Sequence, residues 1–201
     1  MRELVAVEFL SVDGVMQGLG SPDEDRDGGF EHGGWGAPYA SAIDPSAGSD
    51  GLAPTTAYLF GRRTYDSMAA FWPYAPADNP FAAHLTATPK YVASATLTEP
   101  GWQNTEVLRG DLVGEVAALK RTGEGDIVIL GSGQLARTLM AAGLVDRLQL
   151  FVHPLLLGTG NKRLFGDLPT PRALTLEHCS TTALGSVVLT YRFSPQAPSN
   201  V

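Results

Sequence analysis

The sequence predicts a single α/β domain built on a mixed β-sheet that ends in an antiparallel hairpin. Two short apolar runs, 56–60 and 127–130, are each followed by glycine and then by residues at helical spacing. This is the pattern of a buried strand that enters a helix. Near the C-terminus, residues 173–180 and 186–193 alternate apolar and polar side chains on either side of a glycine, as paired antiparallel strands do. We expect one domain over 1–194 and a flexible tail over 195–201.

Composition narrows the class of protein. The 201 residues are 44% hydrophobic with a formal net charge of −7, which argues against nucleic acid or an anionic membrane as the main partner. A single cysteine, Cys179, excludes an internal disulfide and cysteine-based zinc motifs, and no metal site is predicted. There is no 18-residue apolar run and no signal-peptide pattern at the N-terminus, so we expect a cytoplasmic protein.

The N-terminal quarter predicts a strand and a long loop. Residues 4–10 form a hydrophobic run broken by Glu8, and the Asp-Gly step at 13–14 is strong turn chemistry. The glycine-rich stretch 15–36 is long for a loop in a compact domain, so it is either an active-site cover or poorly ordered. Its aromatic residues, Phe30 and Trp35, favour the cover. A short helix is expected within 37–48.

The remaining elements follow from periodicity and from breakers. A helix is expected from Gly61 to about Phe71, before Pro73, and an amphipathic helix over 112–120. The proline- and alanine-rich stretch 74–88 is predicted to be loop. The sequence also predicts strands over 90–93, 105–108 and 148–152, and a helix over 134–142.

Two strand-to-helix turns are candidate anion sites. The Gly-Ser-Gly turn at 131–133 exposes backbone N–H groups at the positive end of a helix, where phosphate commonly binds; a tight turn that binds nothing fits equally well. Arg62 and Arg63 follow Gly61 in the first turn of a helix, where they oppose its macrodipole. A bound anion would reverse that penalty, and two solvated arginines are the alternative.

The segment 131–136, GSGQLA, formally fits a dinucleotide-binding fingerprint. A Rossmann fold fits poorly, because it places the motif in its first βαβ unit and an acid near the end of the second strand. A P-loop is excluded, since no Gly-Lys-Ser/Thr follows. Two anion sites in one domain suit a ligand with separated phosphates, such as NADPH. Arg62 and Arg63 would then hold the 2′-phosphate and 131–133 the pyrophosphate.

These motifs resemble the dihydrofolate reductase-like superfamily, and within it the C-terminal reductase domain of the bifunctional riboflavin-biosynthesis deaminase-reductase. The resemblance covers nearly the whole chain, about residues 2–193. Its motifs are SVDG at 11–14, LFGRRTY at 59–65, VAS at 92–94, LGSG at 130–133, AGLVDRL at 142–148 and PLLLG at 154–158.

The resemblance implies a three-layer αβα fold, NADPH as cofactor and a homodimer. By position, it implies cofactor contacts from Val15, Met16, Gln17, Gly61, Arg62, Arg63, Thr64, Ser94, Leu130, Gly131, Ser132, Gly133, Gln134 and Leu135. Val15 to Gln17 would border the nicotinamide, and Ser94 would lie near the 2′-phosphate. Gln134 takes a position that is often basic in dihydrofolate reductases, which weakens selectivity for that phosphate.

The chain also departs from better-known members of that superfamily. No His-x-Glu with Pro-Cys-x-x-Cys is present, so the zinc deaminase step is excluded and only the reductase step remains. The acid that orients the pterin in dihydrofolate reductases has no firm counterpart. Asp44 and Asp50 are candidates, or plain surface carboxylates; Asp13 is a further candidate, or only a turn residue.

An NADPH-dependent reductase is the expected function. Hydride transfer needs placement, a dry pocket and a proton source but no protein nucleophile. Trp35, Tyr39, Phe71 and Trp72 are the aromatic groups expected to stack on a small pterin-like or pyrimidinone substrate, or else to pack in the core. The four histidines are scattered in a way that chance explains. The alternative is a catalytically silent nucleotide-binding dimer that keeps the fold.

Overall fold

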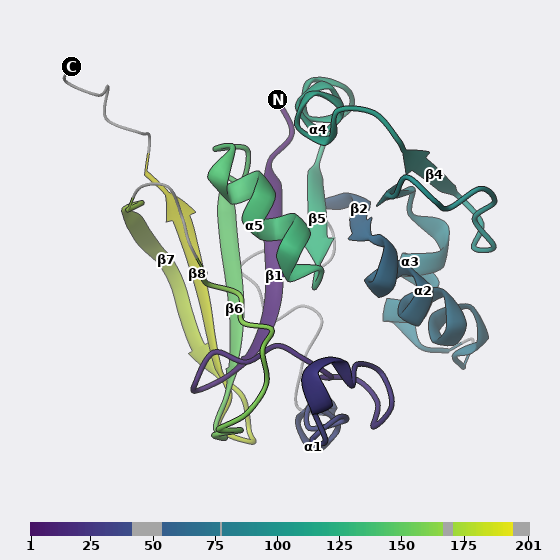
Figure 1. Ribbon diagram of the computed structural model, residues 1–201. Helices are drawn as coiled ribbons and strands as arrows, with labels where there is room; N and C mark the ends of the chain where they lie inside the picture. The colour runs from purple at the N-terminus through teal and green to yellow at the C-terminus, as the bar shows by residue number, and fades with distance from the viewer. Residues whose placement is uncertain (42–53, 77, 167–170, 195–201) are drawn as a thin grey trace.

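The computed structural model describes residues 1–41, 54–76, 78–166 and 171–194. Within them, eight strands form one sheet in the order β4-β3-β2-β5-β1-β6-β8-β7 (Figure 1). The elements in chain order are β1 (Leu4–Ser11), a 3-10 turn (Asp27–Gly29), α1 (Ala37–Ala40), β2 (Thr55–Gly61), α2 (Arg62–Phe71), a second 3-10 turn (Trp72–Tyr74), α3 (Pro80–Ala87), β3 (Lys90–Ala93), β4 (Thr105–Leu108), α4 (Leu112–Arg121), β5 (Asp126–Leu130), α5 (Gly133–Ala141), β6 (Arg147–His153), β7 (Leu174–Thr181) and β8 (Val187–Phe193).

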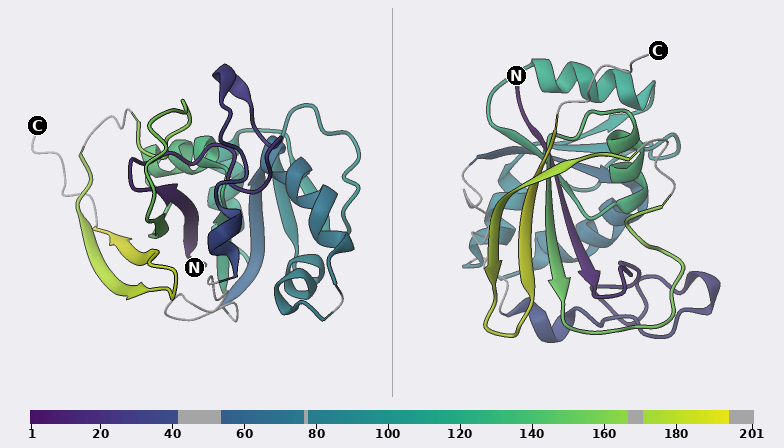
Figure 2. Two further views of the ribbon diagram at one scale, coloured as in Figure 1. Left: turned by 90° about the horizontal axis from the view of Figure 1, so that it is seen from below. Right: turned by 90° about the vertical axis from the view of Figure 1, so that its left-hand side faces the viewer.

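The sheet is mixed, as the sequence predicts. Strands β1 to β6 are mutually parallel, while β8 pairs antiparallel with β6 and with β7. The β7–β8 hairpin extends the sheet beyond β6 (Figure 2, right). Its turn contains Gly185, whose φ of 81° suits glycine. The predicted C-terminal hairpin is therefore confirmed.

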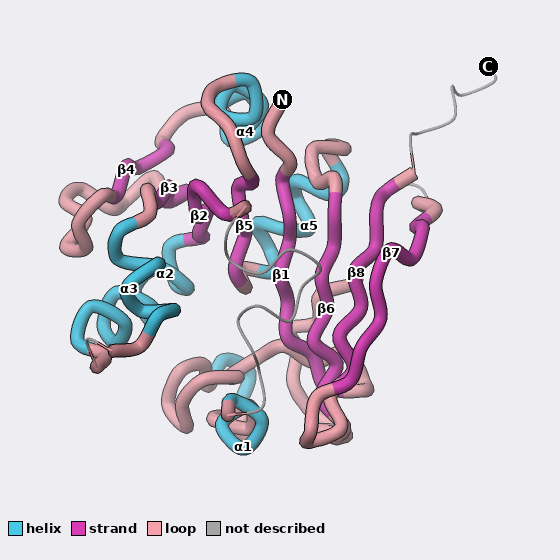
Figure 3. The backbone as a smooth tube through the Cα atoms, turned by 180° about the vertical axis from the view of Figure 1, so that it is seen from behind, coloured by secondary structure: helices cyan, strands magenta, loops and turns pink. Residues whose placement is uncertain are grey.

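Strand β1 contributes to a hydrophobic core on each face of the sheet. Leu4, Ala6 and Leu10 pack in one core with side chains of α4 and α5, whereas Val5 and Val7 pack in the other with side chains of α2 and α3. This alternation follows from the period of two along a strand. In the view from behind, α2 and α3 lie on the β2–β4 half of the sheet (Figure 3). The arrangement is the expected αβα sandwich.

The expectation of loop over 74–88 is wrong, because the structure places α3 there. The Asn79 side chain accepts hydrogen bonds from the backbone N–H groups of Phe81 and Ala82 at 3.0 and 3.1 Å. It is therefore a helix N-cap, and Pro80 occupies the first helical position. A proline is favourable there, since its missing N–H would be unsatisfied anyway. Asn79 and Pro80, which lie in the stretch predicted to be loop, in fact begin a helix.

The other predicted elements agree with the structure to within one or two residues, and β3 and β4 have the predicted bounds. The short helix expected within 37–48 is α1, a single turn; residues 42–53 and the predicted tail 195–201 lie outside the described residues. In the part of the chain that the structure describes, no helix is long and apolar enough to cross a membrane.

Candidate active site

The two predicted anion sites are side by side. Strands β2 and β5 are neighbours in the sheet, so the turns that follow them leave from the same edge. The backbone N–H of Gly61 donates a hydrogen bond to Oγ of Ser132 at 3.0 Å. This bond joins the N-terminus of α2 to the N-terminus of α5. One ligand can therefore contact both helix ends.

Both helices begin without a capping side chain among the described residues. Gly61 is the N-cap of α2 and Ser132 that of α5, and neither N-cap side chain accepts from the first turn. The N–H groups of residues 62–64 and 133–135 are thus the unsatisfied donors that every helix start presents. Added to the positive end of each macrodipole, they form a site for negative charge.

The turn between β5 and α5 has an unusual backbone. Gly131 and Ser132 both adopt left-handed conformations, with φ of 62° and 63°. A non-glycine residue in that region costs about 1–2 kcal/mol, and such strain gathers at ligand sites. Gly133 has a different role, because a Cβ there would lie 2.2 Å from Sδ of Met16 and that side chain would have to move. Met16, a predicted neighbour of the nicotinamide, thus packs directly on the turn that is predicted to hold the pyrophosphate.

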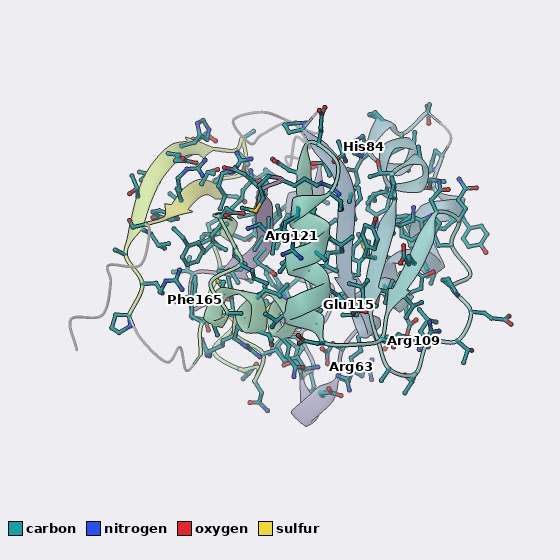
Figure 4. The ribbon with its side chains drawn as sticks, turned by 90° about the horizontal axis from the view of Figure 1, so that it is seen from above. Arg63, His84, Arg109, Glu115, Arg121 and Phe165 are labelled. Atoms are coloured by element: carbon teal, nitrogen blue, oxygen red, sulfur yellow. The ribbon has the colours of Figure 1, made fainter. Side chains whose placement is uncertain are left out.

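Both arginines of α2 are paired with carboxylates in this structure. Nε of Arg62 lies 2.8 Å from Asp66, one turn along the helix, and Arg63 pairs with Asp27. Arg63 lies beside the loop that carries Asp27 (Figure 4). Hydrogen bonds from Lys162 and Arg63 lower the pKa of Asp27 to about 2. These pairs are solvent-exposed, so they contribute little stability.

A crevice opens beside these turns at the carboxyl edge of the sheet. The last paired residues of β1 and β5 are Val7 and Leu130, and the N–H of Gly131 donates to the Val7 carbonyl at 2.9 Å. On its other side β1 stays paired with β6 as far as Ser11. Because β5 ends first, no strand among the described residues pairs with the edge of β1 beyond Val7 on that side. Open α/β sheets bind ligands at such points.

The crevice is part of a cleft of about 2040 Å³. Figure 2 (left) shows this edge of the molecule from below. The predicted cofactor residues that line the cleft are Met16, Gln17, Gly61, Arg62, Arg63, Thr64, Leu130, Gly131, Ser132, Gly133, Gln134 and Leu135. The structure therefore brings together most of the cofactor set, although its role is still a prediction.

Two predicted cofactor residues have other contacts. Val15 is buried with Phe30 and Trp35 in a small core under the 15–36 loop. The hydroxyl of Ser94 accepts from the backbone N–H groups of Thr96 and Leu97 at 3.2 and 3.1 Å. Neither residue lines the cleft. Each organises a loop next to it.

The predicted substrate aromatics fall into two pairs. Phe71 and Trp72, at the end of α2, line the cleft. Trp35 and Tyr39 instead pack against His153, with ring centroids 5.7 and 4.8 Å from the imidazole. They do not line the cleft.

His153 is a cleft residue that the sequence did not single out. It is fully buried, and its Nδ1 lies 2.8 Å from Oγ of Ser186. Burial lowers its pKa to about 4, so the ring is neutral at pH 7. Its Nε2 and the hydroxyl of Thr190, also in the cleft, have no hydrogen-bond partner among the described residues. The interpretation that chance explains the positions of the four histidines is therefore wrong for His153.

Asp13, a predicted catalytic residue, holds two segments together. Its carboxylate accepts hydrogen bonds from the Ser11 hydroxyl at 2.7 Å and from the N–H groups of Leu157 and Gly158 at 3.1 and 3.0 Å. The Ser11 hydrogen bond, followed by those of the backbone, lowers the pKa of Asp13 to about 2. Asp13 does not line the cleft. The other candidates, Asp44 and Asp50, lie outside the described residues.

The mixed sheet, the αβα layers and the cleft at the carboxyl edge define a protein of the dihydrofolate reductase-like fold. Dihydrofolate reductase from Enterococcus faecalis, solved with NADP(H), superimposes with a TM-score of 0.54 at 15% identity, covering 96% of this chain and 97% of that one. A putative riboflavin biosynthesis protein from Shewanella sp. PV-4 gives 0.68 at 21% identity, covering 96% and 99%.

The chain belongs to the RibD C-terminal domain family, whose pattern matches residues 2–190. An uncharacterized protein, YyaP, from Bacillus subtilis strain 168 is 29% identical over 156 residues, which is 76% of this chain and 82% of YyaP. The predicted resemblance is confirmed. Family and fold together support a reductase-type function, and hence an oxidoreductase.

Proposed function

We propose that this protein is an NADPH-dependent reductase that transfers a hydride to a small heterocyclic substrate. The observation that carries the proposal is the joining of two uncapped helix N-termini by the Gly61–Ser132 hydrogen bond, beside Arg62 and Arg63. That arrangement suits a ligand with separated phosphates. The NADP(H) bound in the E. faecalis enzyme of the same fold supports the same choice of cofactor.

The residues present fit this cofactor. In the proposal, the turn at 131–135 holds the pyrophosphate, and the first turn of α2 holds the phosphates of the adenosine half. At Gly131, which is left-handed, an added Cβ would lie 3.6 Å from Cγ2 of Thr64, so the turn leaves room there for close approach to the backbone. When bound, the reduced nicotinamide supplies the hydride. Asp13 supports the site by fixing the loop that carries Met16 and Gln17.

The other part of the cleft suits a flat heterocycle. Val7, Phe9 and Phe151 form an apolar floor on one face of the sheet, with the two phenyl rings stacked at 4.7 Å. Apolar walls exclude water, which protects hydride transfer. Nε2 of His153 and the Thr190 hydroxyl offer unpartnered polar atoms there. We propose a pterin-like or pyrimidinone substrate, with water or Asp44 delivering the proton. By family, the working form would be a homodimer.

The test begins with binding. Wild-type protein is titrated with NADPH while tryptophan fluorescence is followed, because Trp72 lines the cleft. NADPH oxidation is then followed by absorbance with a panel of pterins, pyrimidinones and unrelated carbonyl compounds. Binding together with oxidation by a heterocycle is expected. Absence of NADPH binding would refute the proposal, and tight binding without oxidation would favour the silent nucleotide-binding dimer.

A further inference from the structure

Glu8 is a buried acid in the middle of β1 that the proposed function has not yet used. Its exposed fraction is 0%. Neither carboxyl oxygen has a hydrogen-bond partner in the described parts of the chain. Glu8 nevertheless lines the cleft. An unpartnered buried polar group of this kind costs about 1–3 kcal/mol, so its presence in an apolar strand points to a partner supplied by a ligand.

The protonation state of Glu8 follows from its surroundings. Burial raises the pKa of its carboxyl well above the usual range, and the charge of Arg137 on α5 opposes this only in part. Burial therefore favours the neutral carboxylic acid of Glu8 over its carboxylate. Such an acid has one O–H donor and a carbonyl acceptor side by side.

The position of Glu8 relates it to the cofactor part of the cleft. It directly follows Val7, whose carbonyl accepts the N–H of Gly131, so it lies where the crevice opens. Along β1, Glu8 alternates with Val7 and Phe9 and thus extends from the opposite face of the sheet. That face is covered by α5, which also brings Gly133 and Arg137 to the cleft. The side chain thus points away from the apolar floor.

We propose that the carboxylic acid of Glu8 binds the carboxamide of the nicotinamide ring. The inference rests on the proposed function, because it takes NADPH as the ligand. The acid O–H would donate to the carboxamide oxygen, and the acid carbonyl would accept from the carboxamide N–H. A primary amide has the matching acceptor and donor in the same adjacent arrangement. Glu8 is then a binding residue that orients the ring, and it takes no part in proton transfer to the substrate.

Two variants test the role of Glu8. Glu8→Gln keeps a neutral donor and acceptor, so its NADPH dissociation constant should stay within about threefold of wild type. Glu8→Leu fills similar space without polar atoms, and it should raise that constant about tenfold or more, the equivalent of one to two hydrogen bonds. Its melting temperature should equal or exceed that of wild type, because an unsatisfied buried group has been removed.

Ligand fragments locate the contact. Adenosine 2′,5′-bisphosphate lacks the nicotinamide half, so wild type and Glu8→Leu should bind it equally. The 3-acetylpyridine analogue of NADP has a methyl group in place of the amide nitrogen. The penalty of Glu8→Leu should therefore be several-fold smaller for this analogue than for NADP, the coupling that a double-mutant cycle detects. Dissociation constants come from calorimetry or fluorescence and need no substrate.

The outcomes separate this inference from the proposed function. Unchanged NADPH affinity in Glu8→Leu, with normal binding by wild type, would overturn the inference and leave the reductase proposal standing. An equal loss for NADPH and for adenosine 2′,5′-bisphosphate would overturn it as well, since the effect would then be general. Failure of wild type to bind either compound would overturn both.

Discussion

Ser132 makes two separable contributions, a strained backbone conformation and a hydrogen bond between the two strand-to-helix turns. Its φ of 63° is left-handed, which costs a non-glycine residue about 1–2 kcal/mol. Its Oγ accepts the N–H of Gly61 at 3.0 Å, a bond worth about 1 kcal/mol of net stability. Ser132→Ala loses only the bond, whereas Ser132→Gly loses the bond and also relieves the strain.

The two variants should therefore differ in stability. Ser132→Ala keeps the strain and should lower the free energy of unfolding by about 1 kcal/mol. In Ser132→Gly the relief of strain opposes the loss of the bond. The extra entropy of glycine in the unfolded chain then lowers the free energy of unfolding by about 0.5–1 kcal/mol. The glycine variant should then lie between about 1 kcal/mol below and about 0.5 kcal/mol above wild type, with a midpoint about 0.25 kcal/mol below it.

Urea unfolding measures these differences, and NADPH titration shows whether the bond between the turns matters for binding. Both variants free the Gly61 N–H, so both should bind NADPH about fivefold more weakly than wild type. Stability should thus decrease from wild type to glycine to alanine, while affinity is equal in the two variants. An alanine variant as stable as the glycine variant would refute the strain argument. Wild-type affinity in both would refute the role of the bond.

Three further predictions concern charged residues. Arg62→Ala combined with Arg63→Ala should weaken NADPH binding at least about tenfold and NADH binding less; equal weakening would contradict the assignment of the 2′-phosphate. Asp27→Asn should strengthen NADPH binding by about threefold, because it releases Arg63, and weaker binding would count against that competition. Asp13→Asn should cost about 1–2 kcal/mol of unfolding free energy at neutral pH. The folded-state pKa of Asp13 is lowered to about 2, so its contribution is full above the unfolded pKa of about 3.9 and is lost as the pH falls towards 2. Denaturation at several pH values should show that gap closing, and a constant gap would argue against it.

The strands could be predicted because each carries its own signal. Apolar runs followed by glycine mark β2 and β5, and alternation marks β7 and β8. The candidate anion sites could be predicted for the same reason, because a strand followed by a helix N-terminus can be recognised from neighbouring residues alone. The prediction is wrong for α3, because Asn79 and Pro80 lie in a proline- and alanine-rich stretch although that pair also begins helices.

The remainder of the site depends on contacts between distant segments. His153 owes its unpartnered nitrogen to burial by Tyr39 and to a hydrogen bond between its other ring nitrogen and Ser186, 33 residues away. No spacing in the sequence reveals that combination. For Glu8 a signal did exist, a lone acid inside an apolar strand. Such an acid can be identified as buried only once both faces of the strand are known to be covered.

The alternation of side chains along β1 has an evolutionary consequence. Val7 and Phe9 lie on the face of the proposed substrate floor, and Glu8 lies on the face of the proposed cofactor contact. Substitutions at the first two positions can therefore change which heterocycle fits without altering cofactor recognition. An insertion or deletion of one residue would exchange the two faces and destroy both functions at once. Only replacement at constant length keeps the two faces distinct.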